Sequence, residues 1–469
     1  MSRIYIKDLQ NHKGEEVKVS GWVDVRRDQG KLIFLDIRDI SGKIQSVVLP
    51  NASAMEIAKS LRPEWVVEIL GKVNERPEKN RNIEEENGGI ELEVLSITVL
   101  NEAETPAFDM RSDGKEIGEE HRLEYRYLDL RRPRMYENLK MRHRVAKFIR
   151  DFLDKEKFLE IETPFLTKST PEGARDYIVP ARLYPGKFYA LPQSPQQYKQ
   201  LLMIGGVERY FQIVRCMRDE DTRGDRQPEF TQLDLEMSFV TQEDVMALNE
   251  RLLIEIVTQL YPDKKIQTIP FPKISYEEAV SKYGSDRPDM RDDKNNPDLL
   301  AFCWITDFPF FESTKTSDHN EAVGEWTFTH NPFSAAKQEN LELLLRKKDI
   351  GKIIAQQYDI VLNGFEIGGG SIRNHNPEAL KAVFEIIGYG EDAIEENFGH
   401  MLKALASGAP PHGGIAWGFD RLMMLLQNEP NIREVIAFPK TGEGKDLMMN
   451  SPSEVSLKQL KELGIELSS

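Results

Sequence analysis

Cysteine is scarce in this chain, and the few cysteines show no metal-binding or cross-linking pattern. Cys216 and Cys303 lie far apart, and neither belongs to a CxxC or Cys/His spacing. A zinc site and a disulfide scaffold are therefore disfavoured, and a reducing compartment fits the composition. The opening residues, MSRIYIKDLQ, contain no apolar signal core, and no hydrophobic run approaches the length of a membrane span. We expect a soluble, cytoplasmic protein with no membrane partner.

Basic residues are also in the minority. The 62 lysines and arginines are outnumbered by 78 aspartates and glutamates, which gives a formal net charge of −16. The surface as a whole is therefore no nucleic-acid footprint, and any contact with RNA requires a local basic patch. Residues 121–147 are one candidate, because lysines and arginines outnumber acids there. An ordinary solvated helix and linker fits the same pattern equally well.

The first hundred residues have the strand pattern of a separate unit. Five strand-like segments are present, with a helical stretch at 52–61 between the third and the fourth. Five strands with a helix after the third is the order of an OB-fold barrel, which commonly binds single-stranded nucleic acid. The 469 residues leave room for one or two further domains. The predicted strands cover residues 17–23, 33–38, 44–49, 65–73 and 90–100.

The second predicted strand exposes an aromatic side chain. If Ile33, Leu35 and Ile37 point inward, Phe34 points outward, where a nucleotide base can stack on it. Polar side chains nearby would then read the edges of bases. A loop that partly covers Phe34, and an ordinary solvated strand face, are the alternatives. The candidate base-reading residues are Arg26, Gln45, Glu91 and Glu93.

A polar loop between two strand-like segments at 210–239 is the strongest sign of a binding site. In the second segment Gln232, Asp234 and Glu236 alternate with apolar residues, so that one face carries hydrogen-bonding groups. The loop before it combines arginines with acids and an amide, which is the chemistry that binds a polyanion. A solvated hairpin with surface ion pairs is the alternative. The loop residues are Arg218, Glu220, Arg223, Arg226 and Gln227.

A later hairpin predicts a metal site. Asn363-Gly364 between apolar runs indicates a two-residue turn, which pairs Val361 with Glu366. Asp359 then lies diagonally beside Glu366 on one face. Two close carboxylates repel each other unless a cation lies between them, and Mg²⁺ with ATP phosphates suits such a pair. Greater separation, or neutralisation by an arginine, is the alternative.

Three segments, in order, resemble the signature motifs of class II aminoacyl-tRNA synthetases. They are a helix and strand ending in Pro164, the strand-loop-strand at 210–239, and a Gly-rich strand ending in Arg421. Two further segments, 167–177 and 191–199, are similar to those of bacterial aspartyl-tRNA synthetases in particular. The resemblance covers essentially the whole chain.

This resemblance implies an α+β protein: an N-terminal OB-fold β-barrel, then a class II synthetase core with an antiparallel β-sheet flanked by helices. It assigns residues 1–104 to an anticodon-binding domain, 105–133 to a hinge and 134–469 to a catalytic domain. The helix and strand before Pro164 build the dimer interface in this family, so a homodimer is implied. Relatives carry a sizeable insertion domain where this chain has a short link at 284–300.

The activity implied is ATP-dependent activation of L-aspartate to aspartyl-adenylate and its transfer to the 3′ end of tRNA(Asp), with Mg²⁺ as cofactor. Whether tRNA(Asn) is also charged is left open. Lys79 resembles enzymes restricted to tRNA(Asp), whereas Gln29 matches neither type. In addition, Asn331 follows His330 where many relatives have a second histidine.

The resemblance also carries roles onto individual positions. It assigns catalysis at the phosphates to Arg218 and Arg421. The aspartate-binding set is Glu172, Gln196, Lys199, Asp234, His330 and Arg373. The ATP-binding set is Arg218, Glu220, Gln227, Gln232, Glu366, Gly418, Phe419, Asp420 and Arg421. The metal ligands are Asp359 and Glu366, and the anticodon-binding set is Arg26, Phe34, Gln45, Glu91 and Glu93.

Other functions remain open at this point. Asparaginyl-tRNA synthetase shares the barrel and the core, but the pair Lys199 and Arg373, which suits a carboxylate, argues against it. A non-catalytic paralogue that binds RNA or a metabolite would usually lack motif arginines or metal carboxylates, and both are present here. A tRNA-independent ligase would not need the barrel.

Overall fold

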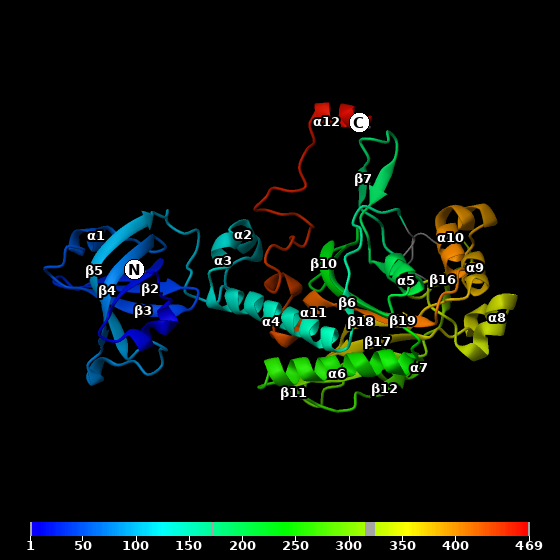
Figure 1. Cartoon of the computed structure of the whole chain (residues 1–469), viewed down its shortest axis with the longest axis horizontal. Coiled ribbons are helices and arrows are strands. Elements are labelled where there is room, and N and C mark those ends of the chain that lie inside the picture. The colour runs from blue at the N-terminus through cyan, green and yellow to red at the C-terminus, as the bar shows by residue number, and fades with distance from the viewer. Residues whose placement is uncertain (1, 170–172, 315–323, 468–469) are drawn as a thin grey trace. The chain divides into compact units, whose positions relative to one another are not determined.

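The chain divides into two compact units, Met1–Gly114 and Lys115–Ser469. The computed structural model describes residues 2–169, 173–314 and 324–467. In Figure 1 the first unit is blue, and the second runs from cyan to red. Within the described ranges, none of the helices combines the length and the apolar character that crossing a membrane requires.

The first unit is a closed barrel with the strand order β1-β2-β3-β5-β4 (Figure 1), so the predicted OB-fold is confirmed. Alternating apolar side chains fill its interior, and Ile33, Leu35 and Ile37 are at most 1% exposed. Helix α1 follows the third strand, as the sequence predicts. The elements are η1 (Ile6–His12), β1 (Glu16–Asp28), β2 (Ile33–Asp39), β3 (Gly42–Val48), α1 (Met55–Ser60), β4 (Val66–Glu75), η2 (Glu78–Asn80) and β5 (Ile90–Asn101).

An eight-stranded sheet with the order β12-β14-β17-β18-β19-β10-β9-β6 forms the centre of the second unit. Neighbouring strands are antiparallel except for two edge pairs, β12 with β14 and β6 with β9. The predicted class II core is thereby confirmed. The strands are β6 (Leu159–Glu160), β9 (Arg209–Met217), β10 (Glu229–Ser238), β12 (Lys273–Ser275), β14 (Phe302–Thr306), β17 (Gln357–Leu362), β18 (Phe365–Ile372) and β19 (His412–Gly418).

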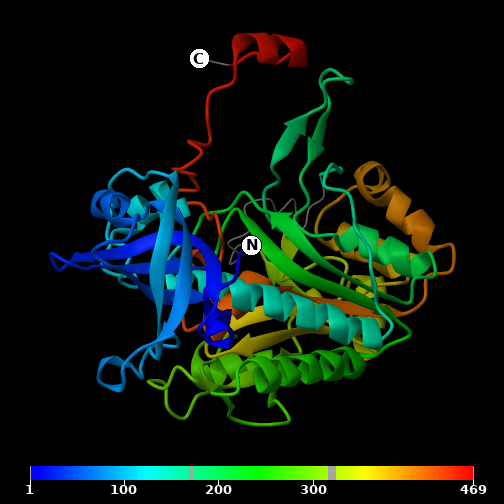
Figure 2. The ribbon, with the colours of Figure 1, turned by 60° about the vertical axis from the view of Figure 1, so that its left-hand side comes forward.

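Helices α4 (Pro133–Lys155), α6 (Gln242–Leu260) and α11 (Phe419–Leu426) pack against this sheet (Figure 2) and share its main apolar core. Proline at the first turn suits the start of α4. A capping box between Thr241 and Asp244 fixes the start of α6. A separate apolar cluster joins α8 (Leu341–Arg346), α9 (Pro377–Ile386) and α10 (Glu391–Leu405).

The remaining elements of the second unit are short. The sheet pairs β7 with β8, β11 with β13 and β15 with β16 have two strands each. Helix α5 contacts β9 and β10. Their bounds are α2 (Glu119–Glu124), α3 (Arg126–Asp129), β7 (Ile178–Pro180), β8 (Phe188–Ala190), α5 (Gln196–Ile204), β11 (Lys265–Ile266), α7 (Tyr276–Tyr283), β13 (Leu299–Leu300), β15 (Phe311–Ser313), β16 (Trp326–Phe328), η3 (Gln338–Asn340), η4 (Ile350–Lys352), η5 (Ile432–Glu434) and α12 (Leu457–Leu463).

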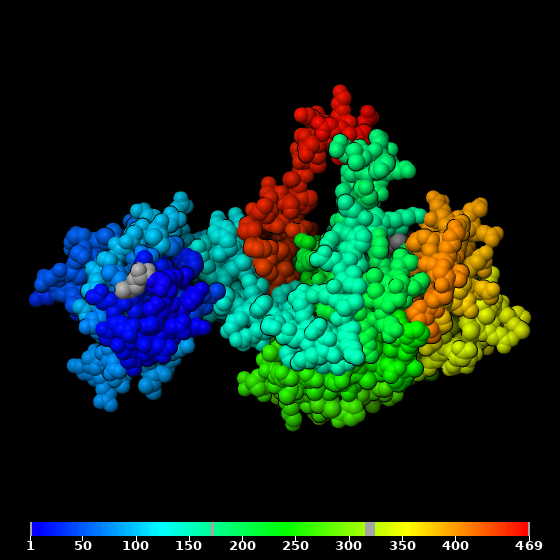
Figure 3. Space-filling view, viewed as in Figure 1, coloured from blue at the N-terminus to red at the C-terminus, as the bar shows by residue number. Residues whose placement is uncertain are grey.

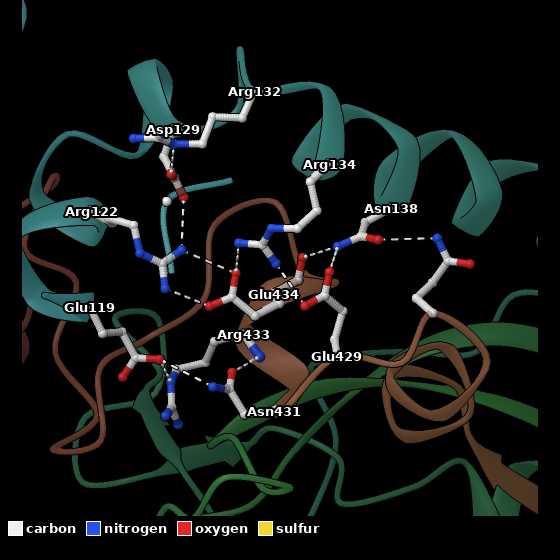
Figure 4. A network of polar contacts seen from close by, with 12 residues as sticks. Glu119, Arg122, Asp129, Arg132, Arg134, Asn138, Glu429, Asn431, Arg433 and Glu434 are labelled. Carbon is white, nitrogen blue, oxygen red and sulfur yellow. Dashed lines mark hydrogen bonds and ion pairs between the residues drawn. The ribbon is translucent and has the colours of Figure 1, made fainter. Parts of the chain in front are cut away.

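A buried network of ion pairs connects α2, α3 and α4 with the segment around η5 (Figure 4). Glu434 lies 2.6 Å from Arg122 Nη2 and 2.9 Å from Arg134 Nη2. Asp129 accepts from Arg126 and Arg132 at 2.8 Å each. Residues 115–133, which the sequence assigned to a hinge, therefore pack within the second unit.

This network corrects the prediction of an RNA-binding patch for the first half of 121–147, and the solvated-helix alternative is equally wrong there. The second half, with the exposed Arg144 and Lys147, stays a prediction. Arg122, Arg126 and Arg132 are at most 5% exposed, so they do not face solvent or RNA. Their charges serve internal acids, which charge counting along the sequence does not reveal. Burial raises the pKa of Glu434, but hydrogen bonds and charges from Arg122 and then Arg134 lower it to about 2.

Glu434→Gln is expected to destabilise the second unit by about 3–5 kcal/mol, because Arg122 and Arg134 each lose one of the two carboxylates that neutralise them inside a buried network. Urea unfolding followed by circular dichroism measures the effect. The matched control is Glu342→Gln, which breaks an exposed pair with Arg346 and should change stability by only about 0.5 kcal/mol. Because the pKa is lowered, the stabilisation by Glu434 persists at neutral pH and disappears as the pH falls from about 4 toward 2. Equal effects of the two variants would contradict this account.

The short link at 284–300 closes without an additional domain. Gly284 ends α7 in a left-handed conformation, with φ of 71°. The side chain of Gln267 holds the link on both sides, donating to Met290 O at 3.0 Å and accepting from Asp292 N at 2.9 Å. Lys264 adds an ion pair to Asp298 at 3.0 Å.

Candidate active site

A cavity of about 450 Å³ opens over the sheet between β10, β18 and β19, with α5 beside it. Almost all of the predicted catalytic and substrate-binding residues line it. Glu172 falls outside the described residues. The predicted residues that line the cavity are Gln196, Lys199, Arg218, Glu220, Gln227, Gln232, Asp234, His330, Asp359, Glu366, Arg373, Gly418, Asp420 and Arg421.

Phe419 and Asp420, which follow Gly418 at the start of α11, contact other parts of the protein and do not present unpaired groups to a ligand. Phe419 is 1% exposed and belongs to the core, where Arg142 covers its ring at 4.8 Å, so it does not line the cavity. Asp420 lines the cavity but accepts from Thr231 N at 2.8 Å and contacts Arg142 Nη1 at 2.6 Å. Adjacent residues at a helix start point in different directions, which the motif spacing alone does not resolve.

Strand β10 supplies the centre of the site. It lies between β9 and β19 in register, so that both of its edges are hydrogen-bonded. Gln232, Asp234 and Glu236 are 8%, 0% and 0% exposed. The polar face predicted from their alternation therefore exists, and it is buried beneath the cavity rather than solvated. This excludes the surface-hairpin alternative.

At one end of the cavity, two buried cations meet two buried carboxylates. Lys199 Nζ lies 2.6 Å from Asp234 Oδ1 and 3.2 Å from Glu236 Oε2. Arg373 forms a two-pronged pair with Glu236, from Nε at 2.9 Å and from Nη2 at 3.2 Å. Burial acts to raise the pKa of Glu236, but Arg373 and Lys199 outweigh it and lower that pKa. The cluster is charge-balanced, and it brings a lysine and an arginine fork to one point.

Glu236 is the functional residue that the site predictions missed. It connects Lys199 and Arg373, which come from α5 and from the end of β18. The alternation along β10 already placed it on the same face as Asp234. What no sequence pattern indicated is that both predicted aspartate-binding cations would converge on it.

Asp234 keeps one carboxylate oxygen available. Its Oδ2 atom is buried and has no donor within hydrogen-bond geometry among the described residues. The hydroxyl of Tyr210 lies close to the same carboxylate, whose charge and hydrogen bonding add to burial in raising the pKa of Tyr210. Burial raises the pKa of Asp234 itself more than Lys199 lowers it. A cationic group bound in the cavity would satisfy this oxygen and stabilise its charge.

At the other end of the cavity, donors lack acceptors. Arg218 stacks on the ring of Phe230 at 5.2 Å, and Arg421 pairs with Asp225 at 3.0 Å and donates to Glu366 O. Arg218 Nε, Arg421 Nε and Gln227 Nε2 are buried without a hydrogen-bond partner in the described part of the chain. Buried donors of this kind call for an anionic ligand. Glu220 also lines the cavity, and its carboxylate lies 3.6 Å from Arg226 Nη1.

The carboxylate hairpin forms as predicted. Val361 pairs with Glu366, and the turn residues Asn363 and Gly364 both have positive φ. A bulge after Ile360, which the sequence did not indicate, sets Asp359 opposite Gly369. A Cβ atom at Gly369 would lie 2.8 Å from Asp359 Oδ1 and 3.5 Å from Glu366 Oε1, so the two carboxylates converge over this glycine.

This pair fits a divalent cation better than it fits neutralisation by an arginine. Burial and the charge of Asp359 raise the pKa of Glu366 in spite of Arg421. His330 Nε2 lies 3.3 Å from Asp359 Oδ2. Over the described ranges, no group of three or more His, Cys, Asp or Glu side chains could hold a metal ion. Two carboxylates that share a site with substrate phosphates are the arrangement Mg²⁺ usually takes.

In the barrel, four of the five predicted base-reading residues lie on one face. Asp36, which follows Phe34 on that face, is paired with Gln45 across β2 and β3. Gln45 Nε2 lies 3.5 Å from Glu91 Oε2, and Glu93 accepts from Asn74 at 2.8 Å. Phe34 is half-buried on the same face.

Arg26 is the exception, and its neighbour Arg27 takes the expected place. A bulge between Val23 and Val25 shifts the phase of β1, so that Arg26 pairs with the inward-facing Leu35 and Arg27 pairs with Phe34. Arg26 donates to the backbone of Lys59 at 2.6 Å. Arg27 instead forms two hydrogen bonds to Asp36, at 2.8 and 2.9 Å, and a third to Gln45 at 3.3 Å.

Two family models match the chain in the places that the geometry indicates. The model described as tRNA synthetases class II (D, K and N) matches residues 118–442. The model of an OB-fold nucleic acid binding domain matches residues 17–100. Together they cover the barrel and most of the second unit.

Curated relatives match over nearly the whole chain. An aspartate–tRNA(Asp/Asn) ligase of Rubrobacter xylanophilus is 42% identical, with 97% of this chain and 95% of the relative covered. An aspartate–tRNA ligase of Macrococcus caseolyticus is 39% identical, with 98% and 97% covered. The first alignment spans 578 positions although this chain has 469 residues, so the relative has more than a hundred residues without a counterpart here. This agrees with an absent insertion.

Solved structures share the fold. An asparaginyl-tRNA synthetase from Pyrococcus horikoshii, complexed with asparaginyl-adenylate, aligns with a TM-score of 0.74 at 23% identity, covering 94% of this chain and 98% of that one. An aspartyl-tRNA synthetase from Entamoeba histolytica aligns with a TM-score of 0.72 at 22% identity, covering 94% and 91%. The motifs, the fold and the matches in sequence agree, and this chain belongs to the class II tRNA synthetases, in the family of the bacterial aspartate–tRNA ligases.

Proposed function

We propose that this protein is an aspartate–tRNA ligase, which activates L-aspartate with ATP and transfers it to the 3′ end of tRNA(Asp). The observation that carries the proposal is the convergence of Lys199 and Arg373 beside the unsatisfied oxygen of Asp234. Two cations suit a side-chain carboxylate, and one anionic oxygen suits an ammonium group. Aspartate carries both groups. The reaction uses ATP and tRNA, and we place it in the cytoplasm.

In the first step, the α-carboxylate of aspartate attacks the α-phosphorus of ATP and displaces pyrophosphate. Arg218, held against Phe230, stabilises the charge that develops on the equatorial oxygens. Arg421 binds the departing phosphates, and Gln227 and Glu220 hold the nucleotide. In the second step, the 3′-hydroxyl of the tRNA attacks the activated carbonyl carbon and AMP leaves.

Asp359 and Glu366 are the residues that would hold Mg²⁺. Their convergence over Gly369, and the raised pKa of Glu366, fit a bound dication. When bound there with ATP, the ion would neutralise charge on the phosphates. His330 contacts Asp359 and thereby helps to orient that carboxylate.

Asparagine is the competing substrate that the site must reject. Its amide would present an NH₂ group to the donors of Lys199 and Arg373, leaving buried donors unpaired. The asparaginyl enzymes among the similar structures match at 23% identity or less, which reflects the shared fold alone. The curated relatives at 39–42% identity favour aspartate.

Charging of two transcripts, tRNA(Asp) and tRNA(Asn), with labelled aspartate tests the proposal directly. The relatives include enzymes named for tRNA(Asp) and enzymes named for both tRNAs. Charging of tRNA(Asp) alone gives a restricted ligase, and charging of both gives a relaxed one. Charging of neither, or efficient use of labelled asparagine, would contradict the proposal.

Phe34→Ala is expected to weaken charging of tRNA(Asp), because base–aromatic stacking contributes about 1–3 kcal/mol. Aspartate-dependent ATP–pyrophosphate exchange should stay unchanged, since Phe34 belongs to the barrel. The kinetics of both reactions are the measurement, with Tyr5→Ala, at an exposed ring elsewhere in the same unit, as control. If both activities fell together while the barrel stayed folded, Phe34 would not be a dedicated anticodon contact.

We propose that two copies associate through the element formed by α4 and the strand after it. Leu159, Phe165 and Leu166 are 58%, 42% and 53% exposed, which leaves an apolar surface uncovered. The hairpin β7–β8 and the segment carrying α12 also stand out from the body of the second unit (Figure 3). Sedimentation equilibrium should give twice the mass of 53.9 kDa. A monomer at micromolar concentration would exclude the dimer.

A further inference from the structure

We infer that His412 is a positioning residue that fixes the direction in which the side-chain amide of Gln196 faces the substrate. The inference rests on the proposed function, because it concerns the same aspartate site. His412 begins β19, is 0% exposed and does not line the cavity. It acts through a chain of buried hydrogen bonds that runs through Gln200 to Gln196.

The first link of the chain sets the tautomer of His412. Its Nδ1 atom lies 2.8 Å from Pro410 O, and a carbonyl oxygen can only accept. Nδ1 therefore carries the proton, and in the neutral ring Nε2 is an acceptor. Gln200 Nε2 lies 3.2 Å from that atom and donates to it.

The second link follows from the first. An amide has one donating and one accepting end, so Gln200, with its nitrogen turned to His412, presents Oε1 in the other direction. That oxygen accepts from Gln196 Nε2 at 3.0 Å. Gln196 therefore keeps its own oxygen, Oε1, for the cavity that it lines. Gln196 and Gln200 are 3% and 0% exposed, so water does not compete for these bonds.

The surroundings keep the ring of His412 neutral. Burial lowers its pKa, and Arg373 and His375 lower it further, which together outweigh Glu236 and the hydrogen bond to Pro410 O that raise it. An acceptor at Gln196 Oε1 is what an ammonium group requires beside Asp234. With the chain reversed, Gln196 would present its NH₂ group to that ammonium, and two donors would face each other.

The test compares two conservative variants that keep different ends of the imidazole. His412→Gln reaches the position of Nε2 and can accept from Gln200. His412→Asn reaches only the position of Nδ1, where it can donate to Pro410 O but leaves Gln200 without its acceptor. In aspartate-dependent ATP–pyrophosphate exchange, we expect the KM for aspartate to rise roughly tenfold or more in His412→Asn and to change about threefold or less in His412→Gln. The KM for ATP should not change in either variant.

Gln200→Leu interrupts the same chain at its middle and serves as the second variant, should an asparagine at position 412 not fold. It should raise the KM for aspartate as His412→Asn does. The double variant, which combines Gln200→Leu with His412→Asn, should have a KM for aspartate no higher than that of either single variant. Equal effects of His412→Gln and His412→Asn, or a parallel rise in the KM for ATP, would overturn the inference. Absence of exchange in the unmodified protein would instead overturn the proposed function.

Discussion

Replacing Arg373 by leucine is expected to abolish aspartate-dependent ATP–pyrophosphate exchange while ATP still binds. Arg373 is 3% exposed and forms a two-pronged pair with Glu236. We assign binding of the substrate's side-chain carboxylate to the same guanidinium. Without it, the site has Lys199 alone to face three carboxylates, those of Asp234, Glu236 and the substrate. Removing one partner of a buried, hydrogen-bonded charge pair costs about 2–5 kcal/mol or more. Exchange kinetics together with calorimetric titration of ATP separate the two functions.

Two variants make this prediction specific. Arg373→Lys keeps the charge but not the planar fork, and exchange should remain strongly impaired. Arg346→Leu changes an exposed arginine of α8 and should leave exchange intact. Thermal melting checks that each protein is folded. Unimpaired exchange in folded Arg373→Leu would refute the assignment of aspartate as substrate.

Arg218→Gln is expected to lower the rate of exchange by about 10²–10³-fold, the usual cost of removing a preorganised charge-stabilising donor. The guanidinium stacks on Phe230, and its buried Nε has no partner in the described structure. It is therefore oriented before substrate arrives. The KM for aspartate should change little, because that end of the cavity is built by other residues. Single-turnover measurement of pyrophosphate release reports the chemical step.

Arg218→Lys separates charge from geometry at the same position. The ammonium group restores charge but neither stacks as a plane nor offers the fork, so only part of the rate should return. The matched control is Arg346→Gln, remote from the cavity. A loss confined to KM, with the chemical step at its normal rate, would mean that Arg218 binds the ground state only.

Local rules predicted the parts of this fold that depend on neighbouring residues. The barrel strands follow from alternation, and the pairing of Val361 with Glu366 follows from Asn363-Gly364, because a two-residue turn fixes which residues pair next to it. The sequence also placed Asp359 and Glu366 on one face, but a bulge after Ile360 shifts the partner of Asp359. The further assignment of roles relied on resemblance, and the roles themselves stay predictions.

What the sequence could not indicate depends on bulges and on distant partners. One bulge exchanged Arg26 for Arg27 on the barrel face, since a single extra residue inverts the phase of a strand. Phe419 lies in the core, although the next two residues, Asp420 and Arg421, line the cavity. The arginines at 121–134 read as a basic surface, but acids near position 430 neutralise Arg122 and Arg134, and Asp129 neutralises Arg126 and Arg132.

The buried network of Figure 4 also determines how small a catalytic fragment can be. A fragment beginning at Pro133 would lack Arg122 and Arg126, and Glu434 would keep only one of its two arginines. Three carbonyl groups between Arg433 and Ala437 would lose the guanidinium of Arg126 that they share. Removal of the barrel alone, by contrast, leaves every one of these contacts in place. A chain that starts at Lys115 should therefore fold and resist proteolysis, whereas one that starts at Pro133 should be cleaved around its C-terminal segment.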